Sequence, residues 1–147
     1  MSPRPPISVG GRSDAALRRA ARYGDQWLAM WHDPDVVAEA TGRLHAMAAE
    51  AGRPAPDVGM LVLVHVDDDV GTARGEAEAY IAGQYHLPFR VVDRWTGYGP
   101  AERIARLLAR YRDAGVSEFV LMPVARDIVG QYERLVEVKR LVVTPAL

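Results

Sequence analysis

Short apolar runs alternate along the chain with longer segments of helical periodicity. Residues 59–66 form a nearly continuous apolar run, which is typical of a parallel strand covered on both faces. Residues 34–51 and 99–114 instead place apolar side chains three and four positions apart, as amphipathic helices do. This alternation predicts an α/β fold made of four successive strand-then-helix units.

The boundaries of these units follow from prolines, glycines and apolar spacing. The expected strands are 7–9, 25–30, 59–66 and 117–122, and the expected helices are about 15–23, 34–51, 70–83, 99–114 and 128–141. The segment 84–98 is less regular and rich in aromatic residues, so it is a candidate for a pocket wall or lid.

Parallel strands joined by helices have right-handed crossovers and place ligand sites at the C-terminal ends of their strands. In this chain the loops after the four expected strands are 10–13, 31–33, 65–68 and 123–126. The topology therefore predicts that these four loops share one face.

The turn from Gly10 to Asp14 carries the clearest chemical signal. Gly10 and Gly11 allow a tight turn with bare backbone, and Ser13 or Asp14 can cap the helix that follows. Unpaired N–H groups at a helix start, the helix dipole and the nearby Arg12 favour an anion, with phosphate the natural candidate. The alternative is that glycine and serine serve the turn geometry alone. The dinucleotide pattern G-x-G-x-x-G is absent.

Composition narrows the class of protein. The 147 residues are 49% hydrophobic and 25% charged, as in an ordinary globular domain. A net charge of -1 gives no electrostatic case for nucleic acid. The chain has no cysteine, which excludes disulfides and fits a reducing compartment. No apolar run approaches the roughly 20 residues of a membrane span. We therefore expect a cytoplasmic protein that binds neither membranes nor nucleic acid.

Several stretches resemble a known family. They are Pro6–Ser13, Arg18–Trp27, Gly99–Ala105, Tyr111–Val116 and Phe119–Leu121. Together they resemble the luciferase-like monooxygenase superfamily, particularly its coenzyme F420-dependent branch. Gln26 departs from the family pattern, which usually has glycine there.

The resemblance implies a TIM-type (β/α)8 barrel, of which these units resemble strands five to eight, the C-terminal half. A full barrel has roughly 250 residues, so about half of it is missing from this chain. We therefore expect residues 1–147 to form a single partial-barrel domain of four βα units that is truncated relative to the family.

By the same resemblance, the turn after strand five binds the phosphate-bearing tail of the cofactor. That role falls on Gly10, Gly11, Arg12, Ser13 and Asp14, the last through its N–H because its carboxylate would repel phosphate. The implied cofactor is coenzyme F420, with FMN as the alternative. The implied function is an oxidoreductase that moves a hydride between this cofactor and a small organic substrate. The alternative is a non-catalytic phosphate- or flavin-binding half-barrel, or an inactive fragment.

Candidates for a substrate pocket lie in the expected loops and in the irregular segment. They are Trp31, His32, His65, Trp95 and Tyr98. His65 ends the strongest strand, where barrel enzymes keep functional groups. Each of these residues also has a purely structural interpretation, as a packed aromatic side chain or a hydrogen-bonded histidine. None is a convincing catalytic base.

The acidic run Asp67–Asp69 is the one feature that suggests a metal ion. Adjacent acids point in different directions, and no second acidic cluster supports them. We expect no metal site.

Four parallel strands leave two open edges and an inner face that a closed barrel would fill. We therefore expect the chain to pair with a copy of itself as a homodimer or with a complementing N-terminal half-barrel. A marginally folded gene fragment is the alternative.

Overall fold

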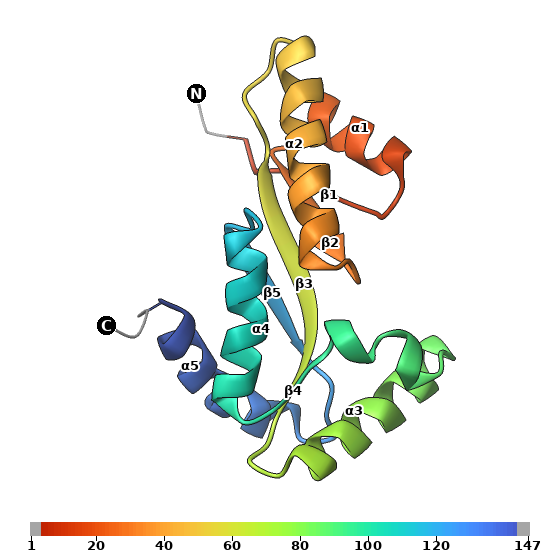
Figure 1. The fold of residues 1–147 in the computed structure, drawn as a ribbon, viewed down its shortest axis with the longest axis vertical. Helices are drawn as coiled ribbons and strands as arrows, with labels where there is room; N and C mark the ends of the chain where they lie inside the picture. Colours follow the sequence, from red (N-terminus) through yellow and green to blue (C-terminus); the bar gives the residue numbers. More distant parts are fainter. Residues whose placement is uncertain (1–3, 144–147) are drawn as a thin grey trace. The chain divides into compact units, whose positions relative to one another are not determined.

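The computed structural model describes residues 4–143 and divides into two compact units. Unit 1 contains the residues up to Leu61 together with Tyr111–Val120. Unit 2 contains Val62–Arg110 and the residues from Leu121 onward. Figure 1 shows the elements of both units, coloured along the chain.

Helices and strands alternate as the apolar pattern predicts. The strands are β1 (Ser8–Gly10), β2 (Gln26–Met30), β3 (Asp57–Val66), β4 (Gly97–Gly99) and β5 (Glu118–Pro123). The helices are α1 (Asp14–Tyr23), α2 (Pro34–Glu50), α3 (Val70–Tyr85), α4 (Ala101–Asp113) and α5 (Ile128–Val143), with 3₁₀ helices η1 (Phe89–Val91) and η2 (Asp93–Trp95). The predicted α/β class is confirmed. Within residues 4–143 no helix is both long enough and apolar enough to cross a membrane.

In unit 1 the strands pair in parallel. β1 pairs with β2, and β2 pairs with residues 57–61 of β3. Gln26 joins all three strands: its side-chain oxygen accepts a hydrogen bond from Ser8 Oγ (2.8 Å), and its amide lies over Gly59, where a Cβ would come within 2.9 Å of it. The glutamine in the glycine position of the family pattern therefore has a structural role.

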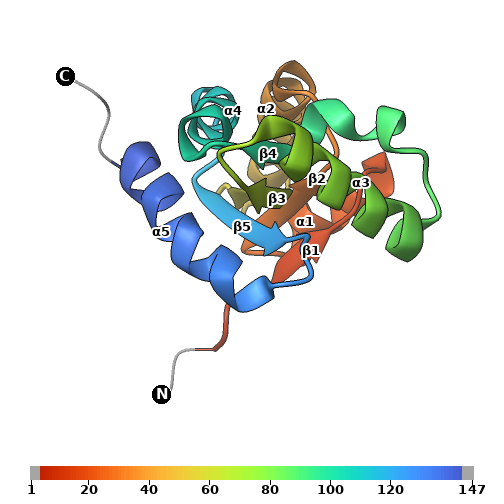
Figure 2. The same cartoon turned by 90° about the horizontal axis from the view of Figure 1, so that it is seen from below.

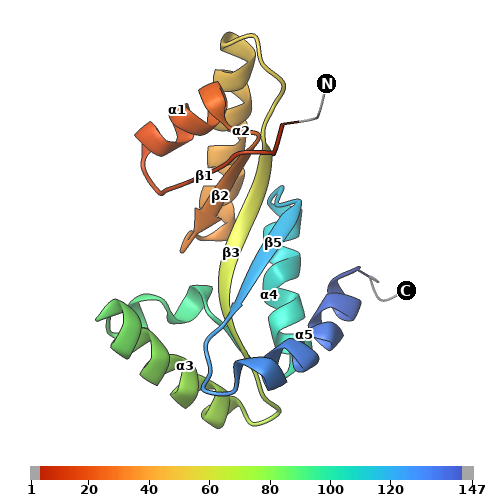
Figure 3. The same cartoon turned by 180° about the vertical axis from the view of Figure 1, so that it is seen from behind.

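The helices of unit 1 cover this sheet with small apolar side chains. Figure 3 shows α1 and α2 side by side next to β1 and β2. Ala20, Ala21, Leu44 and Ala48 from these two helices are fully buried. Tyr111 is also fully buried, and its hydroxyl donates to the His32 carbonyl over 2.7 Å. This bond fixes the loop after β2.

In unit 2 both edges of β3 are paired. β4 runs parallel to the end of β3, with His65 opposite Tyr98. On the other edge the Val124 N–H donates to the Val64 carbonyl over 2.9 Å, next to β5 (Figure 2). Beyond β5 the side chain of Gln131 continues this ladder. It accepts from the Val66 N–H (2.7 Å) and donates to the Val66 carbonyl (3.0 Å).

The segment 84–98, which we expected to be irregular, ends in a regular strand. It contains η1 and η2, but Gly97 and Tyr98 begin β4, a strand that the sequence does not predict. Two glycines in three residues indicate a turn in a sequence. Here Gly97 has a packing reason instead, because a Cβ would come within 3.2 Å of both Val64 and Ile104.

The Gln131 amide gives a test of the ladder in unit 2. We expect Gln131→Leu to leave the N–H of Val66 unpaired and buried and its C=O with only the 3.5 Å contact from Arg134 Nη1, which lowers the free energy of unfolding by about 1–3 kcal/mol. Urea denaturation measures this loss. Glu133→Gln, on the exposed side of α5, is the control and should stay within about 0.5 kcal/mol of the unsubstituted chain. A similarly small effect of Gln131→Leu would contradict the role of this amide.

Candidate functional site

The turn between β1 and α1 is built around bare backbone at Gly11. Gly11 has φ +134°, and a Cβ there would come 2.7 Å from the Cβ of Ala16. Its carbonyl accepts a hydrogen bond from the indole N–H of Trp27 over 3.0 Å, and Trp27 is 2% exposed. The buried Trp27 side chain therefore fixes the turn from the side of the core. Only glycine fits at position 11.

Ser13, not Asp14, caps α1. The Ser13 Oγ accepts from the Ala16 N–H over 3.2 Å, while Asp14 is the first helical residue. The amides of Asp14 and Ala15 belong to the first turn of the helix, where N–H groups have no acceptor within the helix. Together with the positive end of the helix dipole, they form a local site that favours an anion.

A small hollow of about 100 Å³ lies beside this turn in unit 1. Its polar lining comes from Arg12, Ser13, Asp14, His32, Glu39 and Arg43. The structure thus brings Arg12, Ser13 and Asp14 together with His32, whereas Gly10 and Gly11 do not line the hollow. Its volume accommodates a phosphate-sized group but not a ring system.

One ion pair lies beside the hollow. Arg43 Nη2 lies 2.6 Å from Asp14 Oδ1, and this hydrogen bond and charge lower the pKa of Asp14. Burial, and then the positive charge of Arg12, lower the pKa of His32. Since Arg43 compensates the Asp14 carboxylate, its repulsion of an anion is weaker than the sequence alone suggests.

In unit 2, His65 is held at the end of β3. It is 3% exposed, and its Nδ1 lies 3.0 Å from the Val124 carbonyl oxygen. Because a carbonyl can only accept, Nδ1 carries a proton and donates it to Val124. Glu76 Oε2 lies 4.0 Å from Nδ1. This pair is the predicted histidine together with an acid that the sequence did not single out.

Glu76 also lines a larger cavity of about 440 Å³. Its other lining residues are Gly75, Ala79 and Tyr80 from α3 and Ala125 and Arg126 from the loop after β5. The loop 123–126, which the topology placed near His65, does lie there. No local sequence pattern indicates that Tyr80 and Arg126 line a cavity, because only the packing of α3 brings them together.

Tyr98 and Trp95 lie against arginines. The Tyr98 hydroxyl donates to Asp93 Oδ1 over 2.7 Å, and burial raises the pKa of Tyr98. The guanidinium of Arg103 lies 4.7 Å from the centre of the Tyr98 ring, and that of Arg94 lies 4.6 Å from the Trp95 ring. Tyr98 lines a hollow with these arginines, whereas neither Tyr98 nor Trp95 lines the cavity beside Glu76.

Trp31 does not line the hollow beside the glycine turn, although the neighbouring His32 does. Its backbone has φ +54°, an uncommon conformation for a large side chain. The sequence analysis did not identify Trp27 and Arg43 as site residues, although both line the hollow. Arg43 lies one helical turn beyond Glu39 on the same face of α2, a spacing that would have identified it only once α2 was known to face the turn.

The acidic run has a structural role as a helix cap. Asp69 Oδ1 accepts from the Thr72 N–H over 2.6 Å at the start of α3, and Asp67 accepts from the Asp69 N–H over 2.9 Å. Within the described part of the chain, no group of three or more His, Cys, Asp or Glu side chains could hold a metal ion.

The geometry at Gly11 predicts a specific substitution effect. We expect Gly11→Ala to lower the free energy of unfolding by about 1–3 kcal/mol, because the backbone conformation is unfavourable and the new methyl meets Ala16. Gly42→Ala, in α2 of the same unit, is the matched control. A Cβ there meets nothing within 4 Å, so we expect a gain of roughly 0.5–1 kcal/mol. If both variants were equally stable, the turn would not depend on glycine.

Comparison with known proteins first identifies short regions of similarity. Uncharacterized proteins of Mycobacterium bovis and Mycobacterium tuberculosis are each 45% identical over 60 residues, covering 38% of this chain and 20% of the relative. The chain therefore spans only part of these relatives.

Solved structures show a similar fold over nearly all of the chain. An F420-dependent secondary alcohol dehydrogenase in complex with an F420-acetone adduct is 19% identical, with a TM-score of 0.80 over 93% of this chain and 48% of that chain. The coenzyme F420-dependent tetrahydromethanopterin reductase of Methanopyrus kandleri is 16% identical, with a TM-score of 0.68 over 94% and 50%. The EDTA monooxygenase of Chelativorans sp. BNC1 is 17% identical, with a TM-score of 0.71 over 95% and 46%. The chain spans about half the length of these proteins.

A family model described as luciferase-like monooxygenase matches residues 1–116. This match includes the glycine turn, β2, the strongly apolar β3 and the whole of α4. It agrees with the resemblance of the sequence motifs and with the fold of the solved structures. The chain belongs to the luciferase-like monooxygenase family.

Proposed function

We propose that this chain is an oxidoreductase of the luciferase-like class whose glycine turn, Gly10–Asp14, holds the phosphate-bearing part of coenzyme F420 or FMN. The observation that carries the proposal is the bare backbone of Gly11 beside the first amides of α1. The bound cofactor would supply hydride chemistry toward a small organic substrate. Because the chain spans about half the length of the solved relatives, this activity is proposed for a site that other residues complete.

The residues of the turn fit a phosphate group. The amides of Asp14 and Ala15 and the Ser13 hydroxyl are hydrogen-bond donors, and Arg12 adds a guanidinium to the same hollow. The ion pair between Arg43 and Asp14 offsets the carboxylate of Asp14, while Glu39 adds a second carboxylate to the lining. With about 100 Å³ available, the hollow fits the phosphate end and leaves the ring system outside it.

The substrate is proposed to contact residues of unit 2. His65 is held by the Val124 carbonyl through Nδ1 and lies 4.0 Å from Glu76, which lines the cavity, although His65 is not itself a lining residue. The cavity beside Glu76, about 440 Å³, is large enough for a small organic molecule. The other predicted pocket residues divide between the units: Trp95 and Tyr98 remain proposed substrate contacts in unit 2, and Trp31 and His32 remain proposed contacts beside the glycine turn in unit 1.

We also propose that residues 1–147 form a single partial-barrel domain that corresponds to strands five to eight of a TIM-type barrel. Parallel strands alternating with helices, and a TM-score of 0.80 over 48% of a solved relative, support this. Among the described strands β1 pairs only with β2 and β5 only with β3. Each therefore has an open edge, and such edges favour a partner that adds strands.

The outer face of α5 also favours a partner. Val129, Tyr132 and Val136 recur at helical spacing and are 73%, 58% and 56% exposed. We propose a second copy of the chain as the partner, with a separate N-terminal half-barrel as the alternative.

A second candidate function is a non-catalytic phosphate- or flavin-binding half-barrel, or an inactive fragment. The small volume of the hollow in unit 1 favours this alternative, because it has room for a tail but none for a reacting ring.

Cofactor binding tests the first proposal. We expect F420 or FMN to bind saturably, and Arg12→Gln to weaken binding about tenfold through loss of a charge-assisted hydrogen bond. Isothermal titration calorimetry measures both constants. Arg19→Gln, an exposed arginine on α1, removes the same charge and should leave binding unchanged. The proposed role of the turn would be overturned if the folded chain bound neither cofactor. It would also be overturned if both variants lost affinity equally.

The partner proposal has a separate test. Light scattering coupled to size-exclusion chromatography should give twice the chain mass of 16.1 kDa. Val136→Glu should reduce this to a monomer, since it places a charge on the apolar face of α5. A well-folded monomer of the unsubstituted chain would refute self-pairing.

A further inference from the structure

We infer that unit 2 contains a second anion site, formed by arginines of α4 around Tyr98, which would take a doubly charged oxyanion such as a phosphate group. It goes beyond the proposed function, because it assigns an anion site to arginines of α4 that the proposed function does not use, although Tyr98 is also a proposed substrate contact. A hollow of about 190 Å³ marks the site. The lining residues that matter are Asp93, Arg94, Thr96, Tyr98, Arg103 and Arg110.

The hollow carries positive charge that the surrounding residues do not compensate. Within residues 4–143, neither Arg103 nor Arg110 has a carboxylate at ion-pair distance. The one acid in the lining, Asp93, is already engaged: the Tyr98 hydroxyl donates to it over 2.7 Å, and Arg74 Nη2 lies 3.7 Å from its other oxygen. The two α4 guanidinium groups are therefore available to an external anion.

Arg103 is held in place before any ligand binds. Its guanidinium stacks on the Tyr98 ring at 4.7 Å, and Tyr98 is only 8% exposed. Its Cδ passes so close to Gly99 that a Cβ there would lie 3.0 Å away. A stacked guanidinium keeps its edge N–H groups free for hydrogen bonding, so this orientation lowers the entropy lost on binding an anion.

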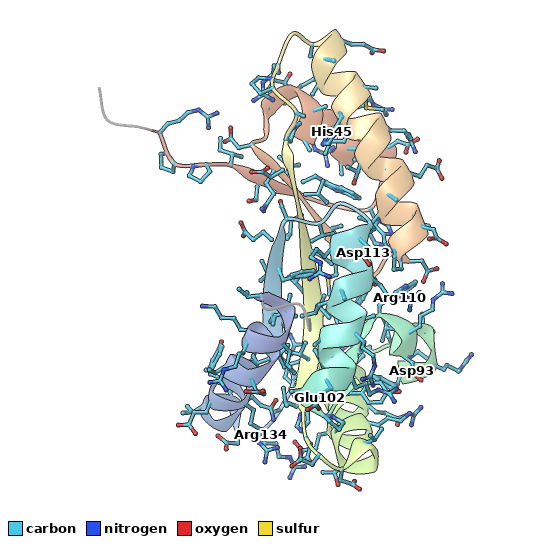
Figure 4. All side chains as sticks on the ribbon, turned by 60° about the vertical axis from the view of Figure 1, so that its left-hand side comes forward. His45, Asp93, Glu102, Arg110, Asp113 and Arg134 are labelled. Carbon is cyan, nitrogen blue, oxygen red and sulfur yellow. The ribbon has the colours of Figure 1, made fainter. Side chains whose placement is uncertain are left out.

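Arg110 follows Arg103 by seven positions on α4, which places both on one face of the helix. Figure 4 shows Arg110 on the side of α4 where Asp93 also lies. Both residues line the same hollow with Arg103.

The chemistry of the donors defines the ligand. Two guanidinium groups bind phosphate or paired carboxylates through several charge-assisted hydrogen bonds, and arginine suits these planar contacts better than lysine. The Thr96 hydroxyl donates to the Val92 carbonyl, so it adds no donor of its own. A volume of about 190 Å³ admits a phosphate with a small substituent.

Titration with inorganic phosphate at constant ionic strength tests the site. We expect saturable shifts of the Gly97 and Gly99 amides in ¹H–¹⁵N spectra. Arg103→Gln and Arg110→Gln should each weaken binding about tenfold, as for loss of a hydrogen bond to a charged group. Arg140→Gln is the matched control, because Arg140 is exposed on α5 in the same unit and pairs with Glu137. A parallel titration with succinate shows whether a dicarboxylate binds as well as phosphate.

Unchanged phosphate affinity in both α4 variants would overturn the site, as would an equal loss in Arg140→Gln. Phosphate binding that is lost only in Arg12→Gln would overturn it too, while supporting the glycine turn as a phosphate site. If F420 and FMN failed to bind but phosphate still shifted the Gly97 and Gly99 amides, the proposed function would fail and the α4 site would be supported.

Discussion

Every backbone group along both edges of β3 needs a hydrogen-bond partner, because nearly all of this ten-residue strand is buried. β2 and then β4 pair with it, and β5 pairs along its other edge. Where β5 ends, Gln131 supplies an amide in place of a strand residue. His65 comes at the paired end of this strand, so its position is set by the same ladder.

The glycine turn connects the fold to the proposed function. Trp27 holds the Gly11 carbonyl from the buried side, and Ala16 leaves no room for a side chain on the other. The backbone is thus exposed to a ligand at the point where α1 presents its first amides. The same packing that forms the turn also forms the donor site, which explains why the motif is a strand, a glycine pair and a capped helix in immediate succession.

Local signals predicted most of the elements. The apolar run of β3 and the spacing of α2 need no tertiary information, and the family motif is itself a local pattern. β4 could not be predicted, because three residues with two glycines resemble a turn until β3 is present as a partner. The residues around the candidate sites could not be predicted from the sequence either. Arg43 reaches the hollow beside the glycine turn only through the packing of α2, and Glu76 reaches His65 only through the packing of α3. The choice of Ser13 over Asp14 as the cap depends on a single backbone geometry.

The central functional claim is that a cofactor tail binds the backbone of the glycine turn. The most direct measurement is a set of ¹H–¹⁵N spectra of the labelled chain as FMN and, separately, F420 are added. We predict that the amides of Gly11, Asp14 and Ala15 shift more than any others and saturate together. If a cofactor bound while these three amides stayed in place, or if no amide moved at all, the claim would be contradicted.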